Sequence, residues 1–307
     1  MIGWFCCEPG EVGNKATISI MISAFREAGL RNGRDQPVKA VLSTLGHAYI
    51  FIKLIYYLLV MTQEIIMQIK KKKPLERLDD NFVIKFINLV LMKNPKLKAK
   101  YDKNSLKEKD KRQIVKLTRN ELNKRYGQFW KNSSLGIMSH TSTRERTKIY
   151  KEAYKSIFKI TGKPKTLLDL GAGLNPLSYN LVGKDVFYYA NELTDADCEL
   201  IKIYLQKNKF NFKIIKGDMM SIDFPYADVC FLFKILDSID VKGHKNSEQL
   251  IKKIKCNYLV VSFSNISIKN KRMNYPKRGW IEQLLKRLNF NFEKIEFPEE
   301  VFYVIKK

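Results

Sequence analysis

The chain has 307 residues, of which 45% are hydrophobic, which is enough for one large domain or two ordinary ones and excludes a disordered polyelectrolyte. Its formal net charge of +25 is concentrated in residues 61–160, which carry +16, whereas residues 1–60 carry +2 and residues 161–307 carry +7. A basic block of this kind predicts attraction to nucleic acid, although a lysine-rich proteome would give the same composition.

The cysteines and histidines indicate a reduced cytoplasmic protein without a metal site. The five cysteines are scattered without a Cys-x-x-Cys pair, and the chain has only three histidines. A structural zinc site would therefore have few available ligands.

The first 60 residues contain one candidate membrane segment, the 14-residue run from Ala48 to Met61. It includes Lys53, is shorter than the roughly 20 apolar residues of a spanning helix, and has no signal-peptide cleavage site. We predict a buried or partly ordered helix and no membrane association. An alternative is that the native start is Met61 or Met67, so no function is assigned to residues 1–74.

Residues 75–160 are predicted to form a basic helical domain that docks on RNA. Residues 79–94 and 109–130 have apolar side chains at helical spacing, and Gly127 is predicted to end the second helix. Ser142 or Thr143 is typical of a further helix start. A lysine-rich helical face can simply be solvated, but the extent of the charge favours contact with phosphates.

From Thr166 onward, predicted strands alternate with predicted helices. This order predicts a mostly parallel sheet with helices on both faces, closed by an antiparallel hairpin, and ligands in such sheets lie at the carboxyl ends of the strands. The strands are predicted at 166–170, 185–192, 211–218, 228–233 and 257–263, the hairpin at 291–307, and helices at 195–208 and 246–255.

The stretch Thr166–Asn180, "TLLDLGAGLNPLSYN", predicts a ligand-binding turn after the first strand. It has one Gly-x-Gly, but Pro176 stands where a dinucleotide site would have its third glycine, and no phosphate-loop lysine follows. Glu192 can accept both ribose hydroxyls of an adenosine, and Asp218 can accept its adenine amino group. Either acid alone could be a plain strand-terminal residue, but together they indicate S-adenosylmethionine (SAM). The predicted cofactor-binding residues are Asp169, Gly171, Ala172, Gly173, Asn175, Glu192, Leu193, Asp218, Met219 and Phe233.

Four segments together resemble the FmrO/Arm-type methyltransferases over residues 80–307: "LDLGAGLNPLSYNL", "HTSTRER", "DVCFLFKIL" and "VVSFSNISIKNKRM". That family modifies guanine N7 in the decoding region of small-subunit ribosomal RNA and gives aminoglycoside resistance. The resemblance implies that Arg144 holds the SAM carboxylate, with an ordinary helix-terminal arginine as the alternative. After the fifth strand the family's proline, arginine and both glycines are absent, whereas Lys271, Arg272 and Met273 remain, so the exact nucleotide stays open.

The residues after the fourth strand favour a ring nitrogen as the methyl acceptor. Such a nitrogen loses no proton before it attacks, so the enzyme supplies mainly position and needs no general base. Lys234 stands where a ribose methyltransferase would have an acid, and no Asn/Asp-Pro-Pro-aromatic box is present. We predict that Lys234 positions the substrate, with a surface lysine as the alternative, and that Cys230 is a core residue.

A basic cluster with interleaved aromatic residues follows the fifth strand. Cations bind phosphates and aromatic faces stack on splayed-out bases, so this cluster is predicted to bind RNA. Trp280 is predicted to be the core-facing start of a helix over residues 279–288. The predicted RNA-binding residues are Lys269, Lys271, Arg272, Tyr275, Lys277 and Arg278.

These patterns predict a Rossmann-like class I SAM-dependent methyltransferase domain at residues 161–307 with a seven-stranded sheet, preceded by the basic domain. The expected function is methylation of guanine N7 in ribosomal RNA, free or within the small subunit, by a cytoplasmic monomer without metal. Two alternatives stay open: action on adenine N1 or on another RNA such as tRNA, and a non-catalytic RNA-binding or assembly factor. The intact glycine turn with Glu192 and Asp218 argues against the second alternative.

Overall fold

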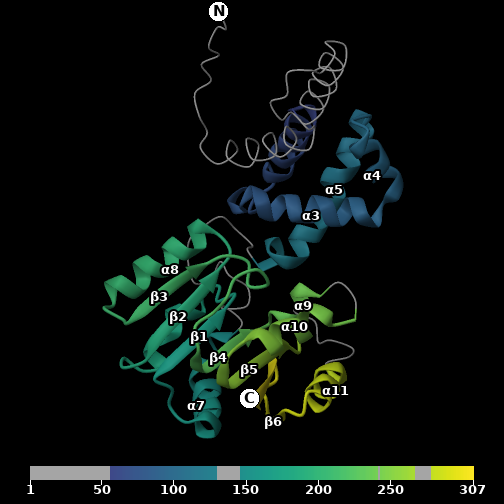
Figure 1. Cartoon of the computed structure of the whole chain (residues 1–307). Coiled ribbons are helices and arrows are strands. Elements are labelled where there is room, and N and C mark those ends of the chain that lie inside the picture. The colour runs from purple at the N-terminus through teal and green to yellow at the C-terminus, as the bar shows by residue number, and fades with distance from the viewer. Residues whose placement is uncertain (1–55, 130–145, 241–242, 267–277) are drawn as a thin grey trace, which may run out of the picture. The chain divides into compact units, whose positions relative to one another are not determined.

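The computed structural model in Figure 1 describes residues 56–129, 146–240, 243–266 and 278–307. The chain divides into two compact units, residues 1–64 with 99–106 and residues 65–98 with 107–307. In the described part of the smaller unit, the hydroxyls of Thr62 and Tyr101 hydrogen-bond at 2.5 Å. The larger unit combines most of the basic helical region with the sheet. None of the helices in the described ranges is long and apolar enough to span a membrane.

The basic region forms helices where the apolar periodicity predicts them. Asp79 caps the first long helix by accepting a hydrogen bond from the backbone N–H of Asn81 at 2.8 Å. The second long helix ends two residues before Gly127, as predicted, whereas the helix start expected at residues 142–143 lies outside the described residues. The elements are η1 (Leu75–Arg77), α3 (Asp80–Lys93), α4 (Pro95–Asp102), α5 (Glu108–Arg125) and η2 (Gly127–Phe129).

A seven-stranded sheet in the order β3-β2-β1-β4-β5-β7-β6 forms the rest of the larger unit. β7 is antiparallel to both of its neighbours, and the other strands run parallel to one another, which confirms the predicted hairpin and sheet. The strands are β1 (Thr166–Leu170), β2 (Phe187–Glu192), β3 (Phe212–Lys216), β4 (Ala227–Phe233), β5 (Cys256–Ser264), β6 (Asn291–Glu296) and β7 (Glu300–Lys306).

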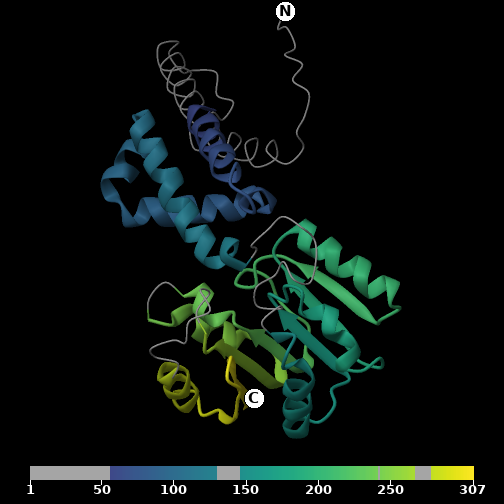
Figure 2. The same cartoon turned by 180° about the vertical axis from the view of Figure 1, so that it is seen from behind.

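Helices cover both faces of this sheet because successive strand residues point to opposite faces (Figure 2). Tyr154 of α7 stacks on Phe231 of β4 at 5.8 Å between ring centroids, and Cys230, one residue earlier, is fully buried on the other face. The predicted core position of Cys230 is therefore confirmed. The predicted boundary at residue 160 assigned α7 to the basic domain, but α7 packs on the sheet. The helices are α7 (Tyr150–Thr161), η4 (Asn175–Leu181), α8 (Asp195–Lys207), α9 (Leu236–Ile239), α10 (Lys245–Lys253) and α11 (Gly279–Arg287).

The strand order reverses between β1 and β4, since β2 and β3 lie on one side of β1 and β5 lies on the other side of β4. In open α/β sheets this reversal opens a crevice at the carboxyl ends of the strands. Several of the acids and glycines singled out in the sequence follow these strand ends, so the topology gathers them at one edge.

Candidate cofactor and catalytic site

A cavity of about 350 Å³ lies at the carboxyl ends of β1 to β4, with α3 and the end of α5 contributing to its wall. It brings together most of the residues predicted to bind the cofactor, whereas Asp169, Gly173 and Asn175 are not part of its lining. The predicted residues that line it are Gly171, Ala172, Glu192, Leu193, Asp218, Met219, Phe233 and Lys234.

The glycine turn after β1 is held in a conformation that favours glycine. Gly171 and Gly173 have φ values of +59° and +57°, in the left-handed region. A Cβ atom on Gly171 would lie 2.5 Å from Cδ1 of Ile235 and 3.0 Å from Cε of Met219. The missing side chain therefore keeps this part of the cavity open.

Glu192 ends β2 with a carboxylate fixed by two backbone donors. The N–H of Gly173 donates to its Oε1, and the N–H of Leu193 donates to its Oε2 at 3.0 Å. Burial, followed by the negative charge of Asp197, raises the pKa of Glu192 to about 8. Asp197 is itself buried and accepts a hydrogen bond from the hydroxyl of Tyr126 at 2.7 Å. Tyr126, which belongs to the basic region, thus contacts Asp197, the carboxylate next to Glu192.

Asp218 follows β3 and lines the cavity. Its Oδ1 accepts the backbone N–H of Met220 at 3.1 Å, which fixes the carboxylate in its own turn. Asn191, which the sequence analysis did not single out, also lines the cavity. Its Nδ2 donates to the carbonyls of Ile215 and Gly217, while its buried Oδ1 has no hydrogen-bond partner among the described residues.

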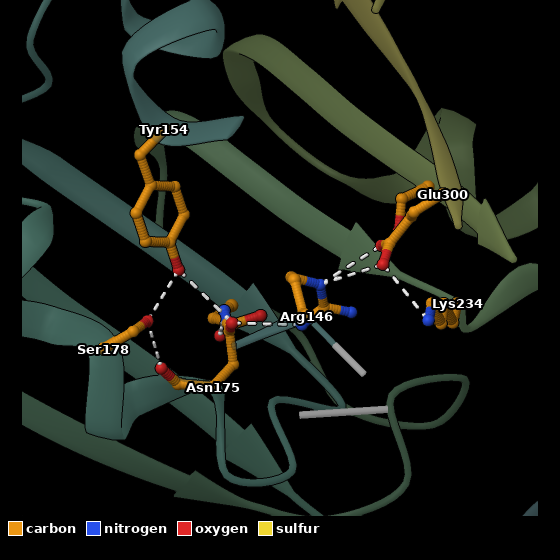
Figure 3. A network of polar contacts seen from close by, with 8 residues as sticks. Arg146, Tyr154, Asn175, Ser178, Lys234 and Glu300 are labelled. Atoms are coloured by element: carbon orange, nitrogen blue, oxygen red, sulfur yellow. Dashed lines mark hydrogen bonds and ion pairs between the residues drawn. The ribbon is translucent and has the colours of Figure 1, made fainter. Parts of the chain in front are cut away.

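A buried polar chain lies behind the glycine turn (Figure 3). Asp169 accepts hydrogen bonds from Nδ2 of Asn175 at 2.7 Å and from the hydroxyl of Tyr188 at 2.6 Å. Oδ1 of Asn175 accepts hydrogen bonds from Nη1 of Arg146 at 3.1 Å and from the hydroxyl of Tyr154 at 3.3 Å. Burial raises the pKa of Asp169 to about 6, against the opposing effect of its hydrogen bonds. Asn175 therefore shapes the turn, and Asp169 supports it from behind.

The same chain continues into a buried ionic cluster. Glu300, at the start of β7, accepts from Nε of Arg146 at 3.1 Å and from the hydroxyl of Ser262 at 2.5 Å, and its Oε2 lies 3.1 Å from Nζ of Lys234 (Figure 3). All three charged side chains are nearly inaccessible to solvent. Burial raises the pKa of Glu300, but Arg146 and Lys234 more than offset this and hold it below its usual value. Within the described ranges, the cluster consists of two cations and one anion.

Lys234 is neither a surface lysine nor an unpaired one. Its backbone has φ +59°, and its ammonium is turned to Glu300 within the cluster while the residue lines the cavity. Contact between Lys234 and a substrate stays a prediction.

Within the described chain, Arg146 is the residue of the cluster that lines the cavity and has a free donor. Its Nε and Nη1 are used by Glu300 and Asn175, but its buried Nη2 has no hydrogen-bond partner among the described residues. The guanidinium lies 4.6 Å from the ring centroid of Phe233 and lines the cavity. An unpaired buried donor is costly unless something binds it, so this edge suits a carboxylate. Arg144, predicted for that role, lies outside the described residues.

The cavity fits a SAM-sized nucleoside with an amino-acid group. It offers a space without a side chain at Gly171, two carboxylates, and two buried groups without partners, Nη2 of Arg146 and Oδ1 of Asn191. The donors and acceptors therefore match a ribose, an adenine and a carboxylate.

Of the predicted RNA-binding residues, only Arg278 falls within the described chain. Its guanidinium pairs with Asp237 at 2.9 Å and lies 5.6 Å from the ring centroid of Phe263. Its charge is therefore compensated, and its contact with RNA stays a prediction. Trp280 packs against the hydrophobic core and stacks on His244 at 3.8 Å, which confirms its predicted core-facing position. Lys269, Lys271, Arg272, Tyr275 and Lys277 lie outside the described residues.

The fold is that of class I methyltransferases. It is similar to the crystal structure of the 16S rRNA methylase RmtB, with a TM-score of 0.61 and 19% identity, covering 80% of this chain and 98% of that one. It is also similar to 16S rRNA methyltransferase RmtF in complex with S-adenosyl-L-homocysteine, with a TM-score of 0.63 and 16% identity over 80% and 98% of the two chains.

Residues 131–304 match the family described as "Ribosomal RNA methyltransferase (FmrO)", and the chain belongs to this family, as the sequence motifs predicted. It is 25% identical over 180 residues to the 16S rRNA (guanine(1405)-N(7))-methyltransferase of Frankia casuarinae, covering 57% of this chain and 63% of the relative. The enzyme of the same name from Micromonospora rosea is 26% identical over 186 residues, or 58% and 66% of the two chains. The chain thus spans less than two thirds of the length of these relatives.

Proposed function

We propose that this protein transfers a methyl group from SAM to N7 of a guanine in small-subunit ribosomal RNA. The cavity at the strand ends, where Glu192 and Asp218 flank the turn at Gly171, supports the proposal most strongly. Membership of the ribosomal RNA methyltransferase family and the names of the relatives point to the same substrate.

In this proposal Glu192 accepts the ribose hydroxyls, Asp218 accepts the adenine amino group, and Nη2 of Arg146 binds the carboxylate. When bound, SAM would supply a sulfonium methyl group that a nitrogen lone pair can attack in line, with S-adenosylhomocysteine as the leaving group. The protein then contributes binding and orientation, which are its main means of accelerating a transfer that needs no proton removal.

The ionic cluster argues against a general base near the end of β4. Glu300 pairs with Lys234, but it is held by two cations and its pKa is below the usual value. An acid of this kind accepts a proton poorly near neutral pH. A ring nitrogen such as guanine N7, which has no proton to lose, therefore fits this site better than a hydroxyl or an amino group.

A groove between helical residues 65–70 and α5 is a suitable surface for the RNA backbone. Its lining residues include no acid, and Arg119 is anchored by hydrogen bonds to the carbonyls of Gln68 and Ile69. Cations without acidic neighbours attract the phosphates of RNA irrespective of its base sequence. The cations that line the groove are Lys71, Lys72, Arg112, Lys116 and Arg119.

We further propose that the protein acts as a monomer in the cytoplasm, where its ribosomal substrate is found.

The proposal is tested by offering tritiated SAM with isolated small subunits, free ribosomal RNA or bulk tRNA, and identifying the labelled nucleoside. We expect 7-methylguanosine in small-subunit RNA. The variant Asp218→Asn should lose most of this transfer, whereas the control Asp223→Asn, whose carboxylate is fully exposed, should retain it. Label in tRNA or as 1-methyladenosine would show that the substrate is wrong. SAM binding without transfer to any of the three would favour a non-catalytic RNA-binding factor.

The carboxylate contact has its own test. Arg146→Lys keeps the charge facing Glu300 but removes Nη2, so it should weaken SAM binding. Binding of 5′-methylthioadenosine, which has no carboxylate, should change little. Equal losses for both ligands in calorimetry would mean that Arg146 acts only as a structural residue.

A further inference from the structure

Lys85 of α3 forms an ion pair with Asp218, the residue whose carboxylate the proposed function assigns to the adenine amino group. Its ammonium lies 2.5 Å from Oδ2 of Asp218, although the two residues are 133 positions apart. The side chain of Lys85 is 51% exposed, whereas that of Asp218 is only 19% exposed. Both residues line the cavity, so the ion pair closes one side of the proposed adenine subsite.

The position of Lys85 follows from the amphipathic pattern of α3. The buried face of this helix is formed by Val83, Phe86, Ile87, Val90 and Leu91. Lys85 lies on the exposed side, between Phe82 and Phe86 along the cavity wall. The same helix therefore presents several apolar side chains, Asn88 and one lysine to the cavity.

The other contacts of Asp218 do not require Lys85. Oδ1 accepts the backbone N–H of Met220 at 3.1 Å, and Oδ2 accepts the hydroxyl of Ser221 at 3.4 Å. The carboxylate would therefore keep its place if the ammonium left. Since Lys85 bonds Oδ2, an adenine amino group that donates to this oxygen meets a charged competitor.

We propose that Lys85 is shared between Asp218 and the RNA backbone, so that SAM binding and RNA binding strengthen each other. This inference rests on the proposed function. Without ligands, Lys85 pairs with Asp218. Adenine takes the carboxylate and releases the ammonium, which then binds a phosphate, and a phosphate that takes Lys85 leaves Asp218 open to adenine. The coupling is reciprocal, because each ligand must change the affinity of the other by the same factor.

Two features make this exchange feasible. An ion pair with a half-exposed lysine contributes little to stability, so either ligand can replace it. The nearby cations Lys93, Lys124 and Arg125 share the one carboxylate of Glu121, so this group of residues keeps a net positive charge. A released Lys85 would therefore add a positive charge to a region whose overall charge already attracts phosphate.

The inference is tested by calorimetric titration of S-adenosylhomocysteine into wild-type protein, Lys85→Gln and the control Lys155→Gln, each with and without isolated small subunits. Lys155 is an exposed lysine of α7 that is not part of the cavity lining. Without RNA, Lys85→Gln should bind the ligand up to about fivefold more tightly than wild type. Small subunits should tighten binding to wild type and to Lys155→Gln by a similar factor, but not to Lys85→Gln.

Weaker binding to Lys85→Gln without RNA would overturn the inference, because Lys85 would then help to hold the cofactor. An unchanged response of Lys85→Gln to small subunits would also overturn it. Thermal unfolding of each variant checks that the fold is intact. If wild-type protein fails to bind the ligand at all, the proposed function itself fails, which separates the two results.

Discussion

Replacing Glu300 with glutamine should destabilise the protein strongly at neutral pH. Glutamine keeps the shape of the side chain, but it removes the anion that Arg146 and Lys234 share. The side chain of Glu300 is 1% exposed, so water cannot compensate for the lost charge. Breaking a buried ion pair by removing one partner costs about 3–5 kcal/mol, because the remaining charge is left without compensation.

The effect should depend on pH in a defined direction. Arg146 and Lys234 hold the pKa of Glu300 below its usual value of 4.5. A group with a lowered folded-state pKa stabilises the fold above its unfolded pKa, and this contribution is lost as the pH falls through the folded pKa. The difference between wild type and Glu300→Gln should therefore be constant at neutral pH and shrink at pH values below 4.5.

Urea unfolding followed by tryptophan fluorescence measures this difference. Glu248→Gln is the matched control, since it removes a carboxylate that is paired with Lys252 and Arg287 on the exposed surface. This control should stay close to wild type. Adding Lys234→Met to Glu300→Gln should recover part of the lost stability, because it removes one of the two cations that Glu300 neutralised in the wild type. A loss below about 1 kcal/mol for Glu300→Gln, or a difference independent of pH, would refute the electrostatic explanation.

Three further predictions concern the ligands. The pKa of Glu192 is raised to about 8, so below that pH the free protein holds a proton on this carboxyl group. Ribose binding should release this proton. The affinity for 5′-methylthioadenosine should therefore rise about tenfold per pH unit up to pH 8. A flat calorimetric profile would contradict this. Gly171→Ala should cost about 1–2 kcal/mol in unfolding free energy and weaken nucleoside binding, because the left-handed backbone disfavours a Cβ atom that would also collide with Ile235. Charge reversal at Lys72 and Arg112 should weaken binding to small subunits and reduce its salt dependence in filter-binding assays, while nucleoside affinity stays unchanged.

The sheet could be predicted from the sequence because its signals are local. Each predicted strand overlaps an observed one, and the boundaries differ by only one or two residues. The glycine turn could also be recognised, because glycine adopts positive φ values more readily than other residues, as Gly171 and Gly173 do. These features depend on neighbouring residues, which is the information that a single sequence carries best.

The ionic cluster could not be predicted in the same way. Arg146 and Glu300 are 154 positions apart, and neither residue type has a pattern around it that indicates a buried pair. The sequence motif drew attention to Arg144, which lies outside the described residues and stays a prediction. Arg146 of the same motif lines the cavity, and the sequence alone did not single it out. For Lys234, the strand end was correct, but the carboxylate that binds it comes from β7, which only the sheet order brings alongside β5.

The composition of the cluster suggests why a buried charge network lies beside the cavity. Glu300 accepts from Nε of Arg146 and Asn175 accepts from Nη1, so the buried edge of Arg146 that lacks a partner among the described residues is Nη2. A ligand carboxylate at that edge would satisfy the donor. Binding of such a ligand would therefore stabilise the cluster, because the free energy that an unsatisfied buried donor costs the fold is recovered on binding. In this view Glu300 holds Arg146 in place for the ligand, and Nη2 favours a nucleoside that bears a carboxylate over a plain nucleoside.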